Sequence, residues 1–232
     1  RSPQVIWLEM ECKSRKQKCR EHVRRLLSYF VLESLKTDDD GIIPLLGGTG
    51  DAMGLEQLRA YLAAEFGEAA AFQLEDDAGN VMGRAVANWL DGQFIQWHTK
   101  LYNKRPIIWH IASPGNNFGV FVYYHKLDRD TLPKVRNLYL RRAQDAAQRA
   151  LLHAREAGNE AEVSRHEDLL DDLRVLDERL ERVINGSVGY KPPKWAEGPY
   201  RNSIYDPVID DGVTVNLMPL QEGGVLRYTK TI

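Results

Sequence analysis

The chain has 232 residues, of which 43% are apolar and 28% charged, and a formal net charge of −2 with a pI near 6.4. Its length allows one large domain or two small ones, and the composition is that of a soluble globular protein. A stand-alone nucleic-acid binder is usually strongly basic, so the chain falls outside that class unless its charges are segregated. No apolar run approaches the roughly 18 residues of a membrane span and no signal peptide is found, so we expect a cytoplasmic protein.

The first predicted element is a helix from Glu9 to Leu35, basic in its first half and with apolar residues at i, i+3 and i+4 spacing in its second half. Its basic residues are Lys13, Arg15, Lys16, Lys18, Arg20, Arg24 and Arg25. A basic run on a helix is more often a solvated face than a binding site. Two interpretations therefore stay open: a solvated face, or phosphate binding to which Arg15 and Lys18 contribute.

Three aspartates and Gly41 end this helix, and a short extended stretch follows at 42–46. The glycine-rich loop at 47–50 lacks the Gly-Lys-Ser/Thr ending with which a phosphate-binding loop contacts a nucleotide. We therefore expect a flexible loop at 47–50 rather than a nucleotide site.

Three helices are predicted next, at 55–66, 81–91 and 93–102, with a short helix or irregular structure at 68–79. The helix at 93–102 carries aromatic and aliphatic residues on one face. The basic turn Lys104-Arg105-Pro106 ends it, because proline lacks an N–H and disfavours a helical residue before it.

Two runs of β-forming residues follow, Ile107 to Ala112 and Phe118 to His125. The segment between them, Ser-Pro-Gly-Asn-Asn at 113–117, has the composition of a turn. Together they predict an antiparallel β-hairpin.

Two long helices are predicted after the hairpin, Thr131 to Ala157 and Asn159 to Asn185, with a Gly-Asn turn between them. Each carries a narrow apolar stripe, which suits a two-helix seam better than burial in a large core. The pair should therefore fold as an antiparallel αα-hairpin that projects from the rest of the chain.

Residues 186–209 lack periodicity and predict an irregular strap held by aromatic anchors, namely Tyr190, Trp195, Tyr200 and Tyr205. Asp210-Asp211-Gly212 predicts a turn, Val213 to Leu217 a short extended segment, and the end of the chain is expected to be loose.

These elements predict an α+β fold that is mostly helical, with a small antiparallel β-hairpin and a long protruding αα-hairpin. We expect three parts: a mixed helical and β-hairpin domain at 1–130 that resembles a recognition domain, the helical hairpin at 131–185, and a C-terminal strap at 186–232 that packs back on the first part.

No catalytic or metal-binding constellation stands out. Cys12 and Cys19 lack a second pair of ligands and are most simply free thiols. His98, His110 and His125 are spread over a helix and two strands without a clear carboxylate partner, so packed side chains are favoured over metal ligands. We find no nucleophile–base pair, and therefore expect no catalysis, cofactor or metal in this chain.

Several ordered pieces carry a family resemblance. They are Tyr-x-Lys-Arg-Pro-Ile-x-Trp at 102–109, the Ser-Pro-Gly turn, Phe-x-x-x-x-Tyr-x-His at 118–125, Asp-x-Asp-Thr-Leu at 128–132, Arg-Arg-Leu-Leu-Ser-Tyr at 24–29 with 39–44, and 210–216 with Pro219-Leu220. In their order along the chain they resemble the region C-terminal to the catalytic domain of large bacterial adenine-specific DNA methyltransferases. These are type IIG restriction–modification enzymes and phage-defence relatives of the BREX kind.

The resemblance implies a parent protein that methylates adenine in DNA with S-adenosylmethionine. This chain has no Asn-Pro-Pro-Tyr element, because Pro192-Pro193 follows Lys191 and precedes Lys194. That absence and the start at Arg1 favour a fragment whose catalytic part lies upstream.

Two functions fit this placement. The first is recognition or clamping of double-stranded DNA by basic and amide side chains near the hairpin, namely Lys100, Lys104, Arg105, Asn116, Asn117 and Lys126, with Arg15 and Lys18. The alternative for the two asparagines is structural, since asparagine tolerates positive φ at a hairpin tip.

The second is an architectural or partner-docking module, in which the helical hairpin is an interaction arm for other defence-system subunits and the basic helix packs back on the upstream methyltransferase domain. It rests on the acidic face of the second long helix, which would repel DNA: Glu160, Glu162, Glu167, Asp168, Asp171, Asp172, Glu178 and Glu181.

Overall fold

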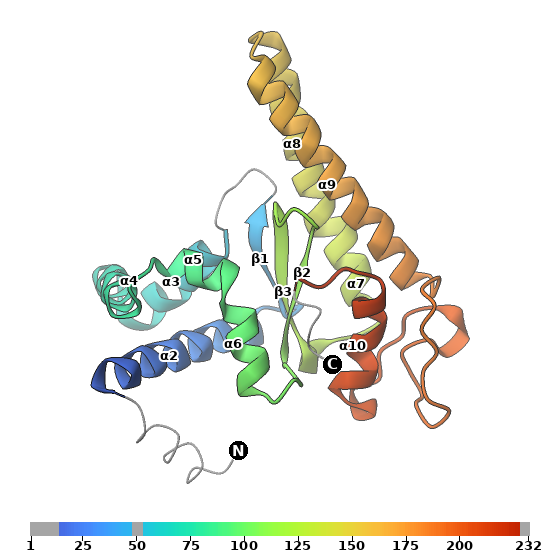
Figure 1. Cartoon of the computed structure of the whole chain (residues 1–232), viewed down its shortest axis with the longest axis horizontal. Coiled ribbons are helices and arrows are strands. Elements are labelled where there is room, and N and C mark those ends of the chain that lie inside the picture. Colours follow the sequence, from blue (N-terminus) through green and yellow to red (C-terminus); the bar gives the residue numbers. More distant parts are fainter. Residues whose placement is uncertain (1–13, 48–52, 228–232) are drawn as a thin grey trace.

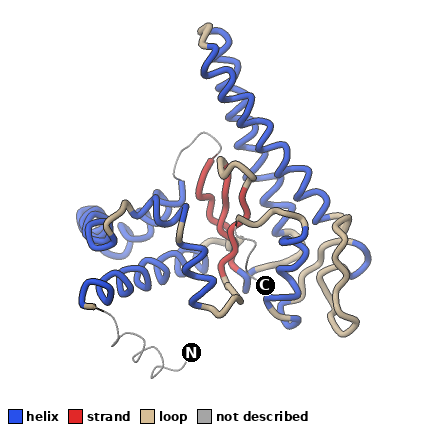
Figure 2. The backbone as a smooth tube through the Cα atoms, in the orientation of Figure 1, coloured by secondary structure: helices blue, strands red, loops and turns tan. Residues whose placement is uncertain are grey.

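The computed structural model describes residues 14–47 and 53–227. A small antiparallel sheet lies at the centre, with helices on both of its faces (Figures 1 and 2). Its three strands lie in the order β1 (Ile42–Gly47), β3 (Phe118–Tyr123) and β2 (Ile108–Ala112). The predicted fold class is confirmed: the chain is α+β and mostly helical, with a small antiparallel sheet and a protruding helical hairpin.

The predicted hairpin is the pair β2–β3, in which Ile108 lies opposite Tyr123. The extended stretch after the first helix becomes a third strand, because β1 pairs with β3 and Ile42 lies opposite Val122. A bulge interrupts the pairing of β1 with β3 after Pro44. A proline is tolerated here because β1 is an edge strand.

Both faces of the sheet are buried, which explains why the strands are apolar throughout rather than alternating. Phe118, Val120 and Val122 of β3 belong to one hydrophobic cluster, which the helices after residue 130 cover. Phe121 belongs to a second cluster, covered by the helices before β2. The sheet is therefore the middle of three layers.

The first helical layer contains α2 (Arg15–Thr37), α3 (Met53–Phe66), α4 (Glu68–Met82), α5 (Val86–Gly92) and α6 (Phe94–Leu101).

Two boundaries in this layer differ from the predictions. Segment 68–79 is part of a full helix, α4, and the helix predicted at 81–91 begins only at Val86. The cause is Gly83, whose left-handed backbone (φ 71°) ends α4. The start of α2 is set by Ser14, whose side chain accepts a hydrogen bond from Gln17 in a capping box. The part of the predicted helix at 9–13 and the loop at 48–50 lie outside the described residues.

The second layer begins with α7 (Thr131–Lys134) and a turn of π-helix, η2 (Val135–Leu140), which lead into α8 (Arg141–Glu156). After the Gly158–Asn159 turn, α9 (Glu160–Ile184) returns antiparallel to α8 and completes the predicted hairpin. This arm projects beyond the sheet (Figure 1).

The C-terminal part contains the short 3-10 helices η3 (Arg201–Ser203) and η4 (Ile209–Asp211) and then α10 (Val213–Glu222). The extended segment predicted at 213–217 is therefore wrong. Helix α10 forms because burying Leu217 and Leu220 against the sheet outweighs the strand preference of the β-branched run before them. The chain then pairs with the edge of β2, where Ala112 N–H donates to Val225. Residues 228–232 lie outside the described residues.

Buried Asn216 holds the strap to α10. Its side-chain amide donates to the carbonyls of Val208 (2.7 Å) and Gly212 (2.9 Å), and its oxygen accepts from Val208 N–H (3.0 Å). Tyr205 is buried beside it, and its hydroxyl donates to the Asn216 carbonyl. Tyr205 is thus a strap anchor, as predicted. Trp195 is not, because 68% of its surface is exposed.

Candidate nucleic-acid interface

The structure places the eight DNA-contact candidates in three separate groups. Lys100, Lys104, Arg105 and Lys126 lie at the end of the sheet where β2 starts and β3 stops. The Asn116–Asn117 tip lies at the other end, because β2 and β3 run between the two ends. The six side chains predicted to act together near the hairpin therefore lie at opposite ends of it, and the prediction is wrong in this respect. The remaining pair, at 15 and 18, lies in the first turn of α2.

The turn after α6 presents three cationic side chains to solvent. Lys104 N–H donates to the Thr99 carbonyl (2.9 Å), and the Lys104 backbone has a positive φ of 65°, which turns the chain sharply. Lys100, Lys104 and Arg105 are exposed. Within 14–47 and 53–227, none of these three side chains has a hydrogen-bond or carboxylate partner. Their charges are therefore available to a ligand.

A rigid support lies behind this turn. Pro106 is buried, and its carbonyl accepts a hydrogen bond from the indole of buried Trp109 (2.9 Å). His98 is buried at the end of α6, and its Nε2 accepts from Ile108 N–H (3.2 Å). Burial lowers the pKa of His98 to about 3, so the ring is neutral, as an acceptor must be. The basic turn is thus held by the core rather than free to move.

Lys126 lies at the same end but has a structural task. Its ammonium donates to the carbonyls of Lys36 (2.7 Å) and Asp38 (2.6 Å), and so caps the C-terminus of α2. Lys36 lies close to the turn: burial raises the pKa of Tyr102, and the Lys36 charge opposes that rise. The Lys36 ammonium is itself paired with Glu33 (2.8 Å). We call Lys36, Lys100, Lys104, Arg105 and Lys126 the basic end of the sheet. Sequence reasoning missed Lys36, because only the pairing of β1 with β3 brings the end of α2 here.

The two asparagines of the hairpin tip bind carboxylates of the chain itself. Asn116 donates to Asp91 (2.8 Å) at the end of α5, and Asn117 donates to Asp172 (2.9 Å) on α9. Asn116 also has a positive φ of 58°. The structural interpretation accounts for both residues, and the neighbouring carboxylates would repel a phosphate.

The basic start of α2 lies at a distance from the basic end. Lys18 and Lys36 are separated by about 27 Å along the helix axis at 1.5 Å per residue. Arg15 is exposed and Lys18 partly exposed, whereas Arg25 pairs with Glu21 (3.2 Å) on the same helix. Exposed cations at the start of α2 fit both interpretations, so the choice between a solvated face and phosphate binding stays a prediction.

The three histidines do not converge. His98 and His110 are buried on α6 and β2, whereas His125 is exposed. Burial also lowers the pKa of His110 to about 3, with a smaller contribution from Arg227. No group of three or more potential metal ligands occurs among the described residues. Cys19 is an exposed free thiol, and Cys12 lies outside the described residues.

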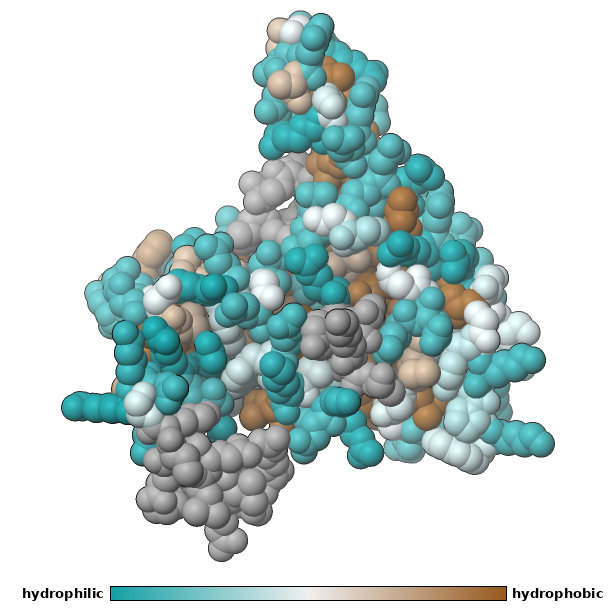
Figure 3. Space-filling model, in the orientation of Figure 1, coloured by the Kyte–Doolittle hydropathy of each residue, from teal (hydrophilic) through white to brown (hydrophobic). Residues whose placement is uncertain are grey.

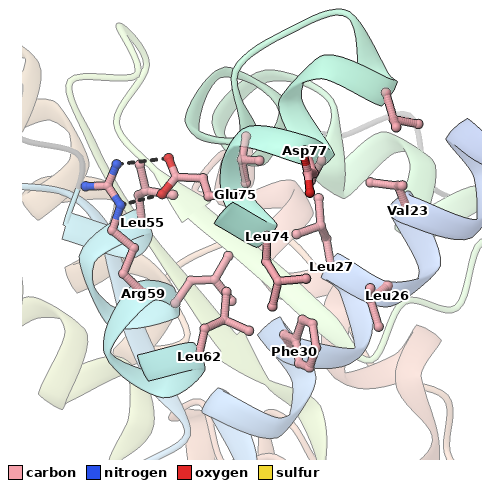
Figure 4. A pocket seen from close by; sticks show the side chains of 14 residues that line it. Val23, Leu26, Leu27, Phe30, Leu55, Arg59, Leu62, Leu74, Glu75 and Asp77 are labelled. Atoms are coloured by element: carbon pink, nitrogen blue, oxygen red, sulfur yellow. Dashed lines mark hydrogen bonds and ion pairs between the residues drawn. The ribbon is translucent and has the colours of Figure 1, made fainter. Parts of the chain in front are cut away.

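An apolar pocket of about 130 Å³ lies among α2, α3 and α4 (Figure 4). Leu27, Phe30 and Leu62 line it, and Arg59 at its rim makes two hydrogen bonds to Glu75, of 2.5 and 2.9 Å. Most of this lining is aliphatic and accepts an apolar group; its two carboxylates are Glu75, which binds Arg59, and Asp77, which accepts a hydrogen bond from Gln73.

Hydrophilic side chains cover most of the face seen in Figure 3, including the arm. None of the described helices is both long and apolar enough to cross a membrane.

The chain can be compared with known proteins. No family model matches it. It is 27% identical over 203 residues to adenine-specific methyltransferase PglX of Lacticaseibacillus casei (strain Zhang), which covers 82% of this chain and 13% of the relative. It is 25% identical over 209 residues to adenine-specific methyltransferase BrxX of Escherichia coli O9:H4 (strain HS), or 79% of this chain and 16% of the relative. The chain is similar to adenine-specific methyltransferases.

The similarity covers most of this chain but a small part of each relative. The position within the relatives that the chain matches, expected to be C-terminal, stays a prediction, as does the division at residues 130 and 185.

The apolar pocket among α2, α3 and α4 does not fit S-adenosylmethionine. That cofactor carries a ribose and a charged amino-acid moiety, both of which require polar partners. The apolar pocket among α2, α3 and α4 is lined mainly by aliphatic side chains. The Glu75 carboxylate at its rim is already paired with Arg59 and is not available to a cofactor.

Proposed function

We propose that this chain is a non-catalytic, DNA-contacting region of an adenine-specific DNA methyltransferase, C-terminal to the catalytic domain, in a cytoplasmic restriction or phage-defence system. Similarity to two adenine-specific methyltransferases over about four fifths of the chain supports the parentage. Methyl transfer and S-adenosylmethionine then belong to the rest of the protein.

The observation that carries the DNA contact is the basic end of the sheet. On a chain with a net charge of −2, Lys100, Lys104 and Arg105 are exposed together on one rigid turn, without a carboxylate partner among the described residues. Unpaired cations on a fixed turn are what phosphate contacts require, because no internal ion pair has to be broken.

The geometry suits positioning on the duplex more than reading of its sequence. Lysine ammonium groups bind phosphates as point charges, whereas the guanidinium of Arg105 can form two parallel hydrogen bonds. The turn follows α6 and precedes an edge strand of the sheet, so three neighbouring cations reach one stretch of backbone. We therefore assign clamping of the duplex to this end.

The test is a binding titration with a labelled duplex and the Lys104→Ala/Arg105→Ala double variant, at low and at moderate salt. A matched control is Arg165→Ala/Arg174→Ala, which removes the same charge from exposed ion pairs on α9. Exposed pairs of this kind contribute about 0–1 kcal/mol to stability, so the control variant should remain folded.

We expect the double variant to lose about 10-fold or more in affinity at low salt and the control to stay near wild type. Equal losses in both variants would show a general charge effect and remove the assignment of the basic end. No measurable binding by the wild type at low salt would reject the DNA function.

A second candidate function follows from the arm. The arm projects beyond the sheet (Figure 1). At its base, Asp172 of α9 accepts a hydrogen bond from Asn117 at the tip of the β2–β3 hairpin. A projecting helical pair of this kind suits docking to another domain or subunit. Most of the acidic residues of α9 are paired within the arm or its base, for example Glu167 with Arg155 and Asp177 with Arg136.

Shortening the arm separates the two functions. Removal of residues 148–168, closed by a short turn, keeps Arg136, Asp172 and Asp177 and so preserves the base. Loss of assembly with the methyltransferase domain or another defence subunit, with DNA affinity unchanged, would support docking. A complex that survives the shortening would reject it.

A further inference from the structure

An exposed tryptophan follows two lysines at a turn in the strap. Trp195 is 68% exposed, and Lys191 and Lys194 are exposed beside it. Tryptophan carries a large apolar surface, and leaving it in water costs about 2 kcal/mol or more of hydrophobic free energy relative to burial. Its exposure is therefore a feature that the packing of this chain does not explain.

The backbone directs Trp195 outward. A hydrogen bond of 3.0 Å from Ala196 N–H to the Pro193 carbonyl closes a β-turn, in which Lys194 and Trp195 occupy the two central positions. The central residues of a turn lie at its outer corner. Pro192 and Pro193 precede them and restrict the backbone on the ascending side of the loop.

The two ends of the loop are fastened to the body of the protein. The rings of Tyr190 and Tyr200 lie in contact, with centroids 6.0 Å apart, and Tyr200 in turn contacts buried Tyr205. Gly198 N–H donates to the Asp211 carboxylate (2.9 Å), and a side chain at position 198 would meet the Asp206 carbonyl at 2.5 Å. The loop is thus a rigid support for one exposed ring and two ammonium groups.

We propose that Trp195, with Lys191 and Lys194, is a second DNA contact, in which the indole stacks on an unpaired or unstacked base and the lysines bind the flanking phosphates. An exposed aromatic side chain with two cations close by in the sequence matches the two parts of a nucleotide, a flat base and an anionic phosphate. Glu197 is the acidic residue within the loop, and its carboxylate lies 3.9 Å from the Arg201 guanidinium. Neither lysine has a carboxylate partner within the described chain.

This contact rests on the proposed DNA function and adds a substrate preference to it. Phosphate contacts at the basic end do not distinguish paired from unpaired bases. A stacking ring does, because the face of a base becomes accessible only where the duplex is opened. The chain should therefore prefer a duplex with an extrahelical or unpaired base over a fully paired one.

The experiment compares two labelled duplexes of equal length, one fully paired and one with a single unpaired adenine. The proteins are the wild-type chain, Trp195→Ala, Trp195→Phe and Lys191→Ala/Lys194→Ala. Because the Trp195 ring is exposed, its removal should leave the melting temperature unchanged. If Trp195→Ala lowers the melting temperature, Trp195→Phe serves as the second variant, because it retains an aromatic ring.

The wild type should bind the interrupted duplex about 5- to 150-fold more tightly than the paired one, which corresponds to about 1–3 kcal/mol for one base–aromatic stack. Trp195→Ala should lose this preference, Trp195→Phe should keep part of it, and the double lysine variant should lose affinity for both duplexes. Quenching of tryptophan fluorescence by the interrupted duplex should be weaker in Trp195→Phe than in the wild type.

Equal affinity of the wild type for both duplexes, or an undiminished preference in Trp195→Ala, would overturn the assignment of Trp195 while leaving the basic end intact. Absence of binding to either duplex by the wild type would overturn both the stacking contact and the DNA function.

Discussion

The side-chain amide of Asn117 donates a 2.9 Å hydrogen bond to the Asp172 carboxylate, and this bond joins the tip of the β2–β3 hairpin to helix α9 of the arm. The same carboxylate accepts a 2.6 Å bond from Gly115 N–H. The hairpin tip thus orients the arm relative to the sheet, rather than presenting its amides to a ligand.

Replacing Asp172 with Ala should lower the free energy of unfolding by about 1–2 kcal/mol, because hydrogen bonds to a charged acceptor are lost at a partly exposed site. Urea denaturation of Asp172→Ala, Asn117→Ala and the double variant gives the coupling between the two side chains. We expect about 1 kcal/mol of coupling. Additive effects would show that the two side chains do not interact in solution.

Replacing Asn216 with Ala should cost about 2–4 kcal/mol, since it leaves several buried backbone groups of the strap without partners. Limited proteolysis should then cut the strap between 186 and 212 before other segments. Thr214→Ala, at a partly exposed position on the same helix, is the control. Equal protease resistance of Asn216→Ala and the control would contradict the role of this amide.

Stability should rise with pH between about 3 and 6.5. The pKa values of His98 and His110 are lowered by burial to about 3 from 6.5, so within this window the unfolded chain binds more protons than the folded chain. Within this window each histidine should raise the free energy of unfolding by about 1.4 kcal/mol per pH unit. Above pH 6.5 neither histidine should add further stability.

The variant His98→Gln keeps an acceptor for Ile108 N–H but does not titrate. It therefore separates the contribution of His98 to the pH dependence of stability from the contribution of the carboxylates. Its free energy of unfolding, measured between pH 5 and 6.5, should rise less steeply than that of the wild type. Identical slopes would mean that His98 is accessible to protons in the folded chain.

Arg136 makes two hydrogen bonds to Asp177, of 2.8 and 3.0 Å, and holds the pKa of that carboxyl below its usual value of 3.8. Arg136→Ala should cost about 1–3 kcal/mol at pH 7. A depressed carboxyl pKa gives stability that is present above the unfolded pKa and is lost as the pH falls through the folded one. The difference between wild type and variant should therefore shrink below pH 4, and a constant difference down to pH 2 would contradict the ion pair.

Much of the fold could be predicted from local patterns. The seam of the arm follows from the helical spacing of apolar residues such as Leu173 and Leu180, and the β2–β3 hairpin from its turn residues. Helix α10 could not, because Val213, Thr214 and Val215 favour a strand locally and only the tertiary contacts of the following leucines decide for a helix.

The candidate site was harder to predict, because sequence proximity does not give position in the fold. Lys104 and Asn117 belong to the same short stretch of sequence, yet the strand β2 separates them. Lys36 and Lys126 are distant in sequence, yet strand pairing brings them together. The exposure of Trp195 follows from the turn at 193–196, whereas composition alone suggested burial.

The most direct measurement of the central claim, that the basic end binds DNA phosphates, is the salt dependence of duplex affinity. For the wild type, the logarithm of the association constant should fall linearly with the logarithm of the salt concentration. In Lys104→Ala/Arg105→Ala, the slope should be smaller in magnitude by about 2, which corresponds to two lost phosphate contacts. A double variant with the same slope and affinity as the wild type would contradict the claim that the basic end binds DNA phosphates.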